Sequence, residues 1–437
     1  MASVAISIDD GNQPPPQIDT EDKRSRAARW IDKWTDRHIF LLDIIGGNGR
    51  PTTKWGTAWK YFCWTMFFLC GPCWGVRNIL IPCKDYEPCE GANIDIMSRV
   101  GWPVAYFFGA IACITQGVRQ NHPEKVKLIE SKTIVVNRGT FARLARAVAA
   151  GVALGTPLTM MWGALPFSKS YGKIAEYHES DSGKRIAATL LQFVFAFGNG
   201  VFLASFFGGI GHAIKWLGVT RKVITRFADE VLAVASKVVG ELEACPDAVE
   251  VVQVGAGAGS STAISMSAVE VGTTNPKQIE AQKKIKQSFE SAWRMVQATN
   301  HIFAMPLSYI FVMTLGAAAY FWYGALVENE LKLIFWCVLM TLIPIALLLW
   351  VGSLGDAYLN ARATLLRPDT SMNLLKVLGR DQAAVFAVSL QRTQLGFDLV
   401  NITVTSNRVL YARPKNYCRA YIFFFRWPQW VSFFAHL

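Results

Sequence analysis

Charged side chains are scarce in this sequence. They make up 17% of its 437 residues, whereas hydrophobic residues make up 52%. This balance excludes an ordinary soluble globular protein, in which about one quarter of the residues are charged. Apolar runs close to the length that crosses a bilayer recur along the chain. We therefore expect an all-α membrane protein whose helices cross the bilayer repeatedly.

Acidic residues are missing from the apolar parts of these runs, and no set of catalytic residues stands out. His212, His301 and His436 lie far apart in the sequence. A membrane-embedded hydrolase, a pump or a proton-coupled carrier usually needs an ionisable group within a span. The sequence therefore predicts that the protein is not an enzyme and holds no metal or cofactor. It favours a protein that binds a weakly polar ligand or passes ions down a gradient.

Two motifs match functional sites by their letters alone. Cys70-Gly-Pro-Cys73 matches a thioredoxin active site, but that chemistry needs a helix N-terminus in water, and this copy lies inside an apolar run. The run from Gly255 to Gly259 lacks the Lys-Ser/Thr of a phosphate-binding loop. The net charge of +12 comes from basic residues that lie mostly between apolar runs. Without a nucleic-acid-binding motif, it predicts no nucleic-acid partner.

The apolar runs predict seven transmembrane helices. Each run except the last offers about twenty predominantly apolar residues, enough for a helix to satisfy its backbone in lipid. The last run is interrupted by Arg419 and Arg426, and Pro428 would bend it. The predicted spans are Ala58 to Ile81, Gly101 to Val118, Leu144 to Phe167, Ile186 to Ile210, Ile302 to Leu326, Leu331 to Val351 and Tyr417 to Phe434.

The connections between the spans indicate the orientation of the chain. Its first residues lack the basic start and the apolar core of a signal peptide, so the N-terminus is expected in the cytosol. Both long connections then fall on the cytosolic side. The loop with Cys83 and Cys89, the one plausible disulfide, falls outside. Seven spans place the C-terminus outside, the reverse of a G-protein-coupled receptor, and we expect a multi-pass protein of the plasma membrane.

Helical patterns continue beyond the spans on the cytosolic side. The fourth span continues as a helix to Leu242, well into the cytosol. After a Gly/Ser-rich flexible link from Gly255 to Pro276, the charged helix Lys277 to Gln297 leads into the fifth span. The pattern from Leu354 to Leu410 also predicts helix. Spans four to seven are therefore expected to carry cytosolic extensions.

These features divide the chain into six parts. The tail contains a possible helix from Arg29 to Ile45, whose spacing suits either the inner membrane surface or packing on the cytosolic part. The parts are the cytosolic tail 1–57, spans one to four in 58–210, the cytosolic helices and flexible loop 211–301, spans five and six in 302–351, the cytosolic anchor helices 352–416 and the terminal helix 417–437.

Aromatic and amide side chains gather on the predicted outer halves of the spans. Aromatic rings with a few hydrogen-bonding groups suit a pocket for a small organic ligand. An interfacial belt of Trp and Tyr, together with core packing, is the alternative for any single residue. Gln192 and Tyr106 lie deeper and favour the pocket. The candidate ligand-binding residues are Trp102, Tyr106, Thr159, Trp162, Gln192, Tyr320, Tyr323 and Trp336.

The second half of the chain contains a recognisable series of short segments. They are Phe289-Glu-Ser-Ala-Trp293, Asn300-His-Ile-Phe303, Tyr320-Phe-Trp-Tyr323, Leu349-Trp-Val-Gly352, Gly355-Asp-Ala-Tyr-Leu-Asn360, Phe386-Ala-Val-Ser-Leu390, Leu395-Gly-Phe-Asp-Leu399 and Val404-Thr-Ser-Asn-Arg-Val-Leu-Tyr411. In these segments the chain resembles the insect gustatory and odorant receptor superfamily. The local similarity is loose and extends roughly from Ser288 to Phe425. It departs from the family's closing signature, because Ala420 replaces a Thr and no Gln follows Tyr421 at the family's spacing.

The resemblance implies a ligand-gated, chemoreceptor-like ion channel. It implies the same inverted seven-span topology, a homotetramer around one central pore, and a small organic ligand bound in the outer half of each subunit. The pore would be lined by the last helix with Tyr421, and Phe424 or Phe425 would form an apolar gate for ions that are expected to be cations. A non-channel scaffold or trafficking protein with the same fold, and a G-protein-coupled receptor, are the alternatives.

The predicted orientation can be tested with epitope tags at the two ends of the chain. On intact cells, an antibody should reach a C-terminal tag and should reach an N-terminal tag only after permeabilisation, because seven spans put the ends on opposite sides. Immunofluorescence with and without detergent measures this. An N-terminal tag stained on intact cells would favour the G-protein-coupled receptor instead.

Overall fold

The computed structural model describes residues 25–49, 53–80, 101–132, 139–168, 180–244, 276–326, 334–392, 395–399 and 402–404. The seventh predicted span with Tyr421, Phe424 and Phe425, and the loop with Cys83 and Cys89, lie outside these residues. The helices are α1 (Arg26–Ile45), α2 (Lys54–Leu80), α4 (Trp102–Gln120), α5 (Pro123–Glu130), α6 (Thr140–Trp162), α8 (Ser182–Ala244), α9 (Pro276–Leu326), α10 (Ile334–Leu365), α11 (Pro368–Leu378) and α12 (Arg380–Arg392), and the strands are β1 (Phe397–Leu399) and β2 (Ile402–Val404).

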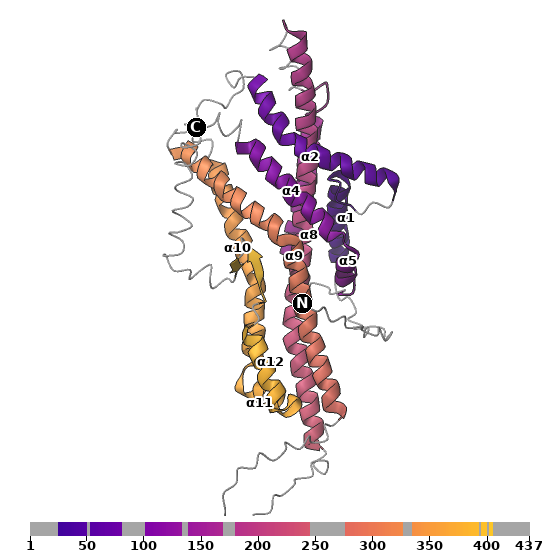
Figure 1. Cartoon of the computed structure of the whole chain (residues 1–437), viewed down its shortest axis with the longest axis vertical. Coiled ribbons are helices and arrows are strands. Elements are labelled where there is room, and N and C mark those ends of the chain that lie inside the picture. The colour runs from indigo at the N-terminus through magenta and orange to yellow at the C-terminus, as the bar shows by residue number, and fades with distance from the viewer. Residues whose placement is uncertain are drawn as a thin grey trace, which may run out of the picture.

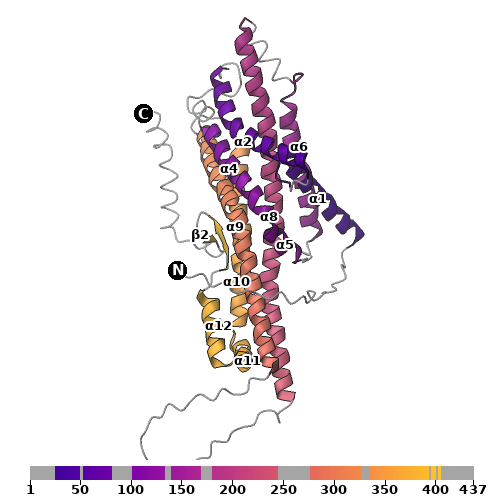
Figure 2. The same cartoon turned by 45° about the vertical axis from the view of Figure 1, so that its right-hand side comes forward.

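The molecule is an elongated bundle built along α8 (Figure 1). In its upper half, α2, α4 and α6 pack around α8, with α1 beside them (Figure 2). In its lower half, α8 packs against α9 and α10, and α11 and α12 cover the lower end. We call these two halves the upper bundle and the lower bundle.

Four helices in the described part of the chain, α6, α8, α9 and α10, are long and apolar enough to cross a membrane. The protein is therefore an α-helical, multi-pass membrane protein. The helices α2 and α4 also coincide with predicted spans, although they do not belong to these four.

The helical extension predicted for the fourth span is present as continuous helix. Helix α8 runs for 63 residues without a break, so it is about 95 Å long at 1.5 Å per residue. The charged segment from Lys277 belongs to the 51-residue helix α9, which continues directly into the fifth predicted span. Both extensions pair along the lower bundle (Figure 1).

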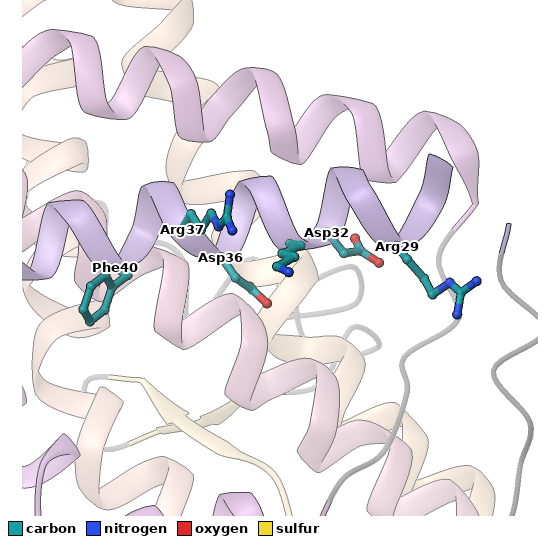
Figure 3. Close-up of a pocket in the computed structure, with 6 residues that line it drawn as sticks. Arg29, Asp32, Asp36, Arg37 and Phe40 are labelled. Carbon is teal, nitrogen blue, oxygen red and sulfur yellow. The ribbon is translucent and has the colours of Figure 1, made fainter. Parts of the chain in front are cut away.

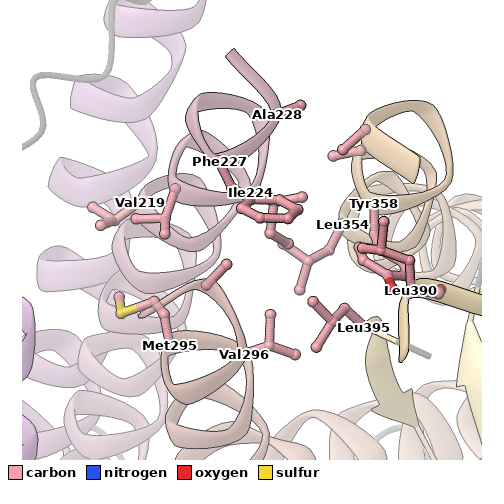
Figure 4. Packing of buried hydrophobic residues seen from close by; sticks show 14 of the residues in the cluster. Val219, Ile224, Phe227, Ala228, Met295, Val296, Leu354, Tyr358, Leu390 and Leu395 are labelled. Atoms are coloured by element: carbon pink, nitrogen blue, oxygen red, sulfur yellow. Dashed lines mark hydrogen bonds between the residues drawn. The ribbon is translucent and has the colours of Figure 1, made fainter. Parts of the chain in front are cut away.

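The lower bundle has a well-packed apolar core between α8, α9 and α10. Phe227 of α8, Met295 of α9 and Leu354 of α10 are almost fully buried in it (Figure 4). The hydroxyl of Tyr358 donates to the carbonyl of Leu390 over 2.9 Å, which ties α10 to α12. Burial of this continuous apolar stripe stabilises the packing of the three helices.

The helical pattern predicted from Leu354 to Leu410 is wrong over its later part. Helices α10, α11 and α12 end by Arg392, and β1 and β2 follow as an antiparallel pair with Phe397 opposite Val404. Ile402, Thr403 and Val404 are β-branched residues, which favour a pleated strand over a helix. The side chain of Asn300 completes the pairing, because its amide contacts the carbonyl of Gly396 and the N–H of Asp398.

Close helix packing in the upper bundle depends on small residues. A Cβ atom at Gly71 would lie 2.5 Å from the carbonyl oxygen of Pro103, so α2 and α4 touch there by their backbones. A Cβ atom at Gly200 would lie 2.8 Å from the carbonyl oxygen of Pro157 in α6. The Cys70-Gly-Pro-Cys73 sequence thus lies within α2 as a helix-packing element, with the Cys70 thiol buried against the carbonyl of Phe195.

Gly71→Ala should destabilise the protein, whereas Gly155→Ala should not. The first places a methyl group against a backbone oxygen and forces α2 and α4 apart, at a cost of about 1–3 kcal/mol. A Cβ atom at Gly155 would meet nothing within 4 Å. Alanine also has less conformational freedom than glycine in the unfolded chain, so less entropy is lost when the helix forms. Thermal unfolding in one detergent compares them. Equal melting temperatures would contradict the close contact between α2 and α4.

Candidate functional site

Two of the predicted pocket residues lie in one aromatic and amide cluster of the upper bundle. Tyr106 of α4 donates its hydroxyl to Oδ1 of Asn199 on α8 over 2.9 Å. The ring of Tyr106 lies 5.1 Å from Phe202, and Trp74 of α2 lies 4.3 Å from Phe195. Gln192 lies on the same side of α8, one turn before Phe195 and two turns before Asn199, since residues three and four apart share a helix face. We call these side chains the aromatic amide cluster.

Two buried polar atoms near this cluster have no hydrogen-bond partner among the described residues. They are the Nε1 donor of Trp74 and the Oε1 acceptor of Gln192. Gln192 is only 4% exposed, so water does not reach it freely. A buried donor or acceptor without a partner costs about 1–3 kcal/mol, and such groups in native proteins usually serve a purpose. One N–H donor and one carbonyl acceptor suit a small ligand that carries the complementary groups.

The other predicted ligand-binding residues lie elsewhere. Thr159 donates to the carbonyl of Gly155 within its own helix, and Trp162 is 58% exposed on α6. Tyr323 and Trp336 are exposed on α9 and α10, where Trp336 stacks on Phe321. Tyr320 and Trp102 are half-buried. Their positions suit the alternative interpretation of an interfacial belt.

A second polar group, which the sequence does not reveal, lies where α1 meets the middle of α8. Nε2 of His212 lies 2.5 Å from Oδ2 of Asp43. The amide of Asn48 donates to the hydroxyl of Ser205 over 2.5 Å. Both Asp43 and Asn48 are more than nine-tenths buried. We call these four residues the α1 clasp.

Glycines make the α1 clasp possible. A Cβ atom at Gly208 would lie 2.8 Å from Oδ1 of Asp43, and one at Gly46 would lie 2.5 Å from the backbone nitrogen of Ser205. Asp43 lies before the first predicted span, so its pairing with His212 joins residues far apart in the sequence. The clustered glycines on both sides were the one signal in the sequence that could have indicated this close approach.

Helix α1 is also fixed at its other end. Nε of Arg143, on α6, lies 3.2 Å from Oδ2 of Asp32, and Arg146 is 4.0 Å from the same carboxylate. Arg143 is 6% exposed, so this ion pair is buried and holds α1 on α6. The structure therefore places one face of α1 against the protein and leaves the opposite face exposed.

No protein-family model matches the chain, and no curated protein is significantly similar to it. The resemblance to gustatory receptors therefore stays a prediction. In the described part of the chain, no three His, Cys, Asp or Glu side chains gather in a way that could hold a metal ion.

Asn199→Leu and Gln192→Leu should differ in their effect on stability. The first leaves the buried hydroxyl of Tyr106 unpaired, at a cost of about 1–3 kcal/mol. The second replaces an acceptor that has no partner in the described chain, so it should be neutral or slightly stabilising. Melting temperatures of the ligand-free protein measure both. A loss for Gln192→Leu as large as that for Asn199→Leu would show that Gln192 is already paired.

Proposed function

We propose that the protein is a chemoreceptor-like, ligand-gated ion channel of the plasma membrane. It assembles as a homotetramer with seven spans per subunit, a cytosolic N-terminus and an extracellular C-terminus. The last helix, with Tyr421, Phe424 and Phe425, lines a central pore that conducts cations. The resemblance supports this assembly, and the unpaired donor and acceptor at the aromatic amide cluster support a ligand site in the upper bundle.

The observation that carries the proposal is the continuity of α8 between the aromatic amide cluster and the lower bundle. Gln192 and Asn199 lie near its start, and Phe227 lies in the core of the lower bundle. The two regions are therefore joined by one continuous helix. We infer that a change in the packing around Gln192 is passed along α8 to the lower bundle, whose helices would carry the subunit contacts of the proposed tetramer.

The cluster also indicates the chemistry of the ligand. It contains several aromatic rings, and its unpaired groups among the described residues are one donor, on Trp74, and one acceptor, on Gln192. Among the described residues that form the cluster, none carries a charge. We infer a neutral organic ligand with at least one acceptor and one donor. It opens the channel by binding the open arrangement more tightly than the closed one.

Planar-bilayer recordings of the purified protein test the proposal. A panel of neutral organic compounds with one donor and one acceptor should include agonists that evoke cation currents. Trp74→Phe and Gln192→Leu, which remove the unpaired donor and acceptor, should raise the half-maximal concentration roughly tenfold each, since a hydrogen bond to a ligand contributes about 1.5 kcal/mol.

Phe141→Ala is the matched control, because Phe141 is 85% exposed at the start of α6 and lies outside the cluster. It should leave the agonist concentration unchanged. Silence of a folded, tetrameric protein across the whole panel would favour the scaffold instead. A monomeric particle would contradict both the shared pore and the assembly.

A further inference from the structure

The exposed face of α1 combines basic and large apolar side chains. Trp30 is 66% exposed and Phe40 is 60% exposed, and Leu41 and Ile44 also reach the surface. The basic side chains lie between them on the same face, since successive members recur at three- and four-residue spacing. They are Arg26, Arg29, Lys33 and Arg37, all exposed.

The opposite face of α1 is fully occupied by the protein. Ala28, Thr35, Ile39 and Leu42 are buried there. The α1 clasp and the Asp32–Arg143 ion pair hold this face on α8 and α6. The exposed face is therefore presented in a fixed direction.

The C-terminal end of α1 lies beside the start of α2. Nε1 of Trp59, in the second turn of α2, donates to the carbonyl of Ile44 over 2.7 Å. Trp55, one residue after α2 begins, is 86% exposed. Tryptophan and lysine at the end of a span are typical of the lipid headgroup level. If α2 crosses the bilayer, α1 lies at this level.

The charges on the exposed face suit an anionic surface. Arg29, Lys33 and Arg37 line an open groove of about 490 Å³ together with Phe40 and two carboxylates (Figure 3). One of these carboxylates, Asp32, is engaged by Arg143. Among the described residues of α1, Asp36 is then the one acidic side chain on the exposed face beside four cations, which leaves this face of the helix positive.

We propose that this face of α1 binds the anionic phospholipid headgroups of the adjacent leaflet. Arg29, Lys33 and Arg37 contact phosphate and carboxylate groups, while Trp30, Phe40 and Leu41 enter the boundary between headgroups and acyl chains. A soluble acidic protein would use the same cations but would not need the interleaved aromatic and aliphatic side chains beside the start of α2. The expected orientation places α1 on the cytosolic leaflet, which carries the anionic lipids.

Native mass spectrometry of the full-length protein tests this proposal. The protein is released from mixed micelles that contain equal amounts of phosphatidylserine and phosphatidylcholine, and the lipids that remain bound are counted. The wild-type protein should retain phosphatidylserine preferentially, and this preference should fall at high salt because exposed charges are screened. Arg29→Gln/Lys33→Gln/Arg37→Gln should reduce the preference by roughly tenfold or more, since basic residues near an anionic surface attract its headgroups.

Two matched variants separate lipid binding from other causes. Lys283→Gln/Lys286→Gln/Arg380→Gln removes three exposed charges from the lower bundle and should keep the wild-type preference. Arg29→Lys/Arg37→Lys keeps the charge of α1 and should also keep the preference. An unchanged melting temperature in phosphatidylcholine nanodiscs should show that the triple α1 variant is folded, because its changed side chains are exposed.

Two results would overturn the proposal. The first is a wild-type protein that retains both lipids equally. The second is a folded triple α1 variant that keeps the wild-type preference for phosphatidylserine, in which case an acidic protein becomes the alternative occupant of the face.

Discussion

The unbroken hydrogen-bond ladder of α8 is the constraint on which the other helices depend. A helix satisfies its own backbone, so one element can continue from lipid into water without a change of structure. What changes along α8 is its surface. Near Gly198 and Gly200 it lets α2 and α6 approach by their backbones, and beyond Trp216 it presents a stripe of Val, Ala and Phe to α9 and α10. Helix α8 contains no proline, whereas α2, α6, α9 and α10 each have one in the helix interior.

The α1 clasp fixes the position of the amphipathic helix α1 on α8. Apolar burial alone has no direction, so it would let α1 slide along α8. A buried polar group that loses its hydrogen-bond partner destabilises the protein. The pairs Asp43–His212 and Asn48–Ser205 therefore fix one position of α1 along α8. Glycines at 46 and 208 bring the backbones close enough for these short side chains to meet. The outward face of α1 follows from this register.

The sequence predicted the helices well and the tertiary contacts poorly. Apolar runs and helical periodicity are local properties, so they located α2, α4, α6, α8, α9 and α10 and the extension of α8 beyond Ile210. The hairpin after α12 was missed because its strands have three residues each and depend on Asn300, about one hundred residues away. Of the candidate site, Tyr106 and Gln192 were predicted from their depth in a span. Asn199, Trp74 and the partner of His212 were not, because a pairing between distant segments leaves no periodic signal.

The contacts around Tyr106 connect the candidate site to a proline-containing turn of α9. Tyr309 of α9 donates its hydroxyl to the carbonyl of Ala105, the residue before Tyr106. One turn earlier in α9, Pro306 has no N–H to pair with the carbonyl of Ile302, so the helix is weakest there. A small cavity of about 10 Å³, lined by Pro306 and Gln116 among others, lies at the same level. A ligand that moved Tyr106 would shift the carbonyl of Ala105 and, through Tyr309, this proline turn. The movement would then pass along α9 into the lower bundle, beside the connection that α8 makes between Gln192 and the same bundle.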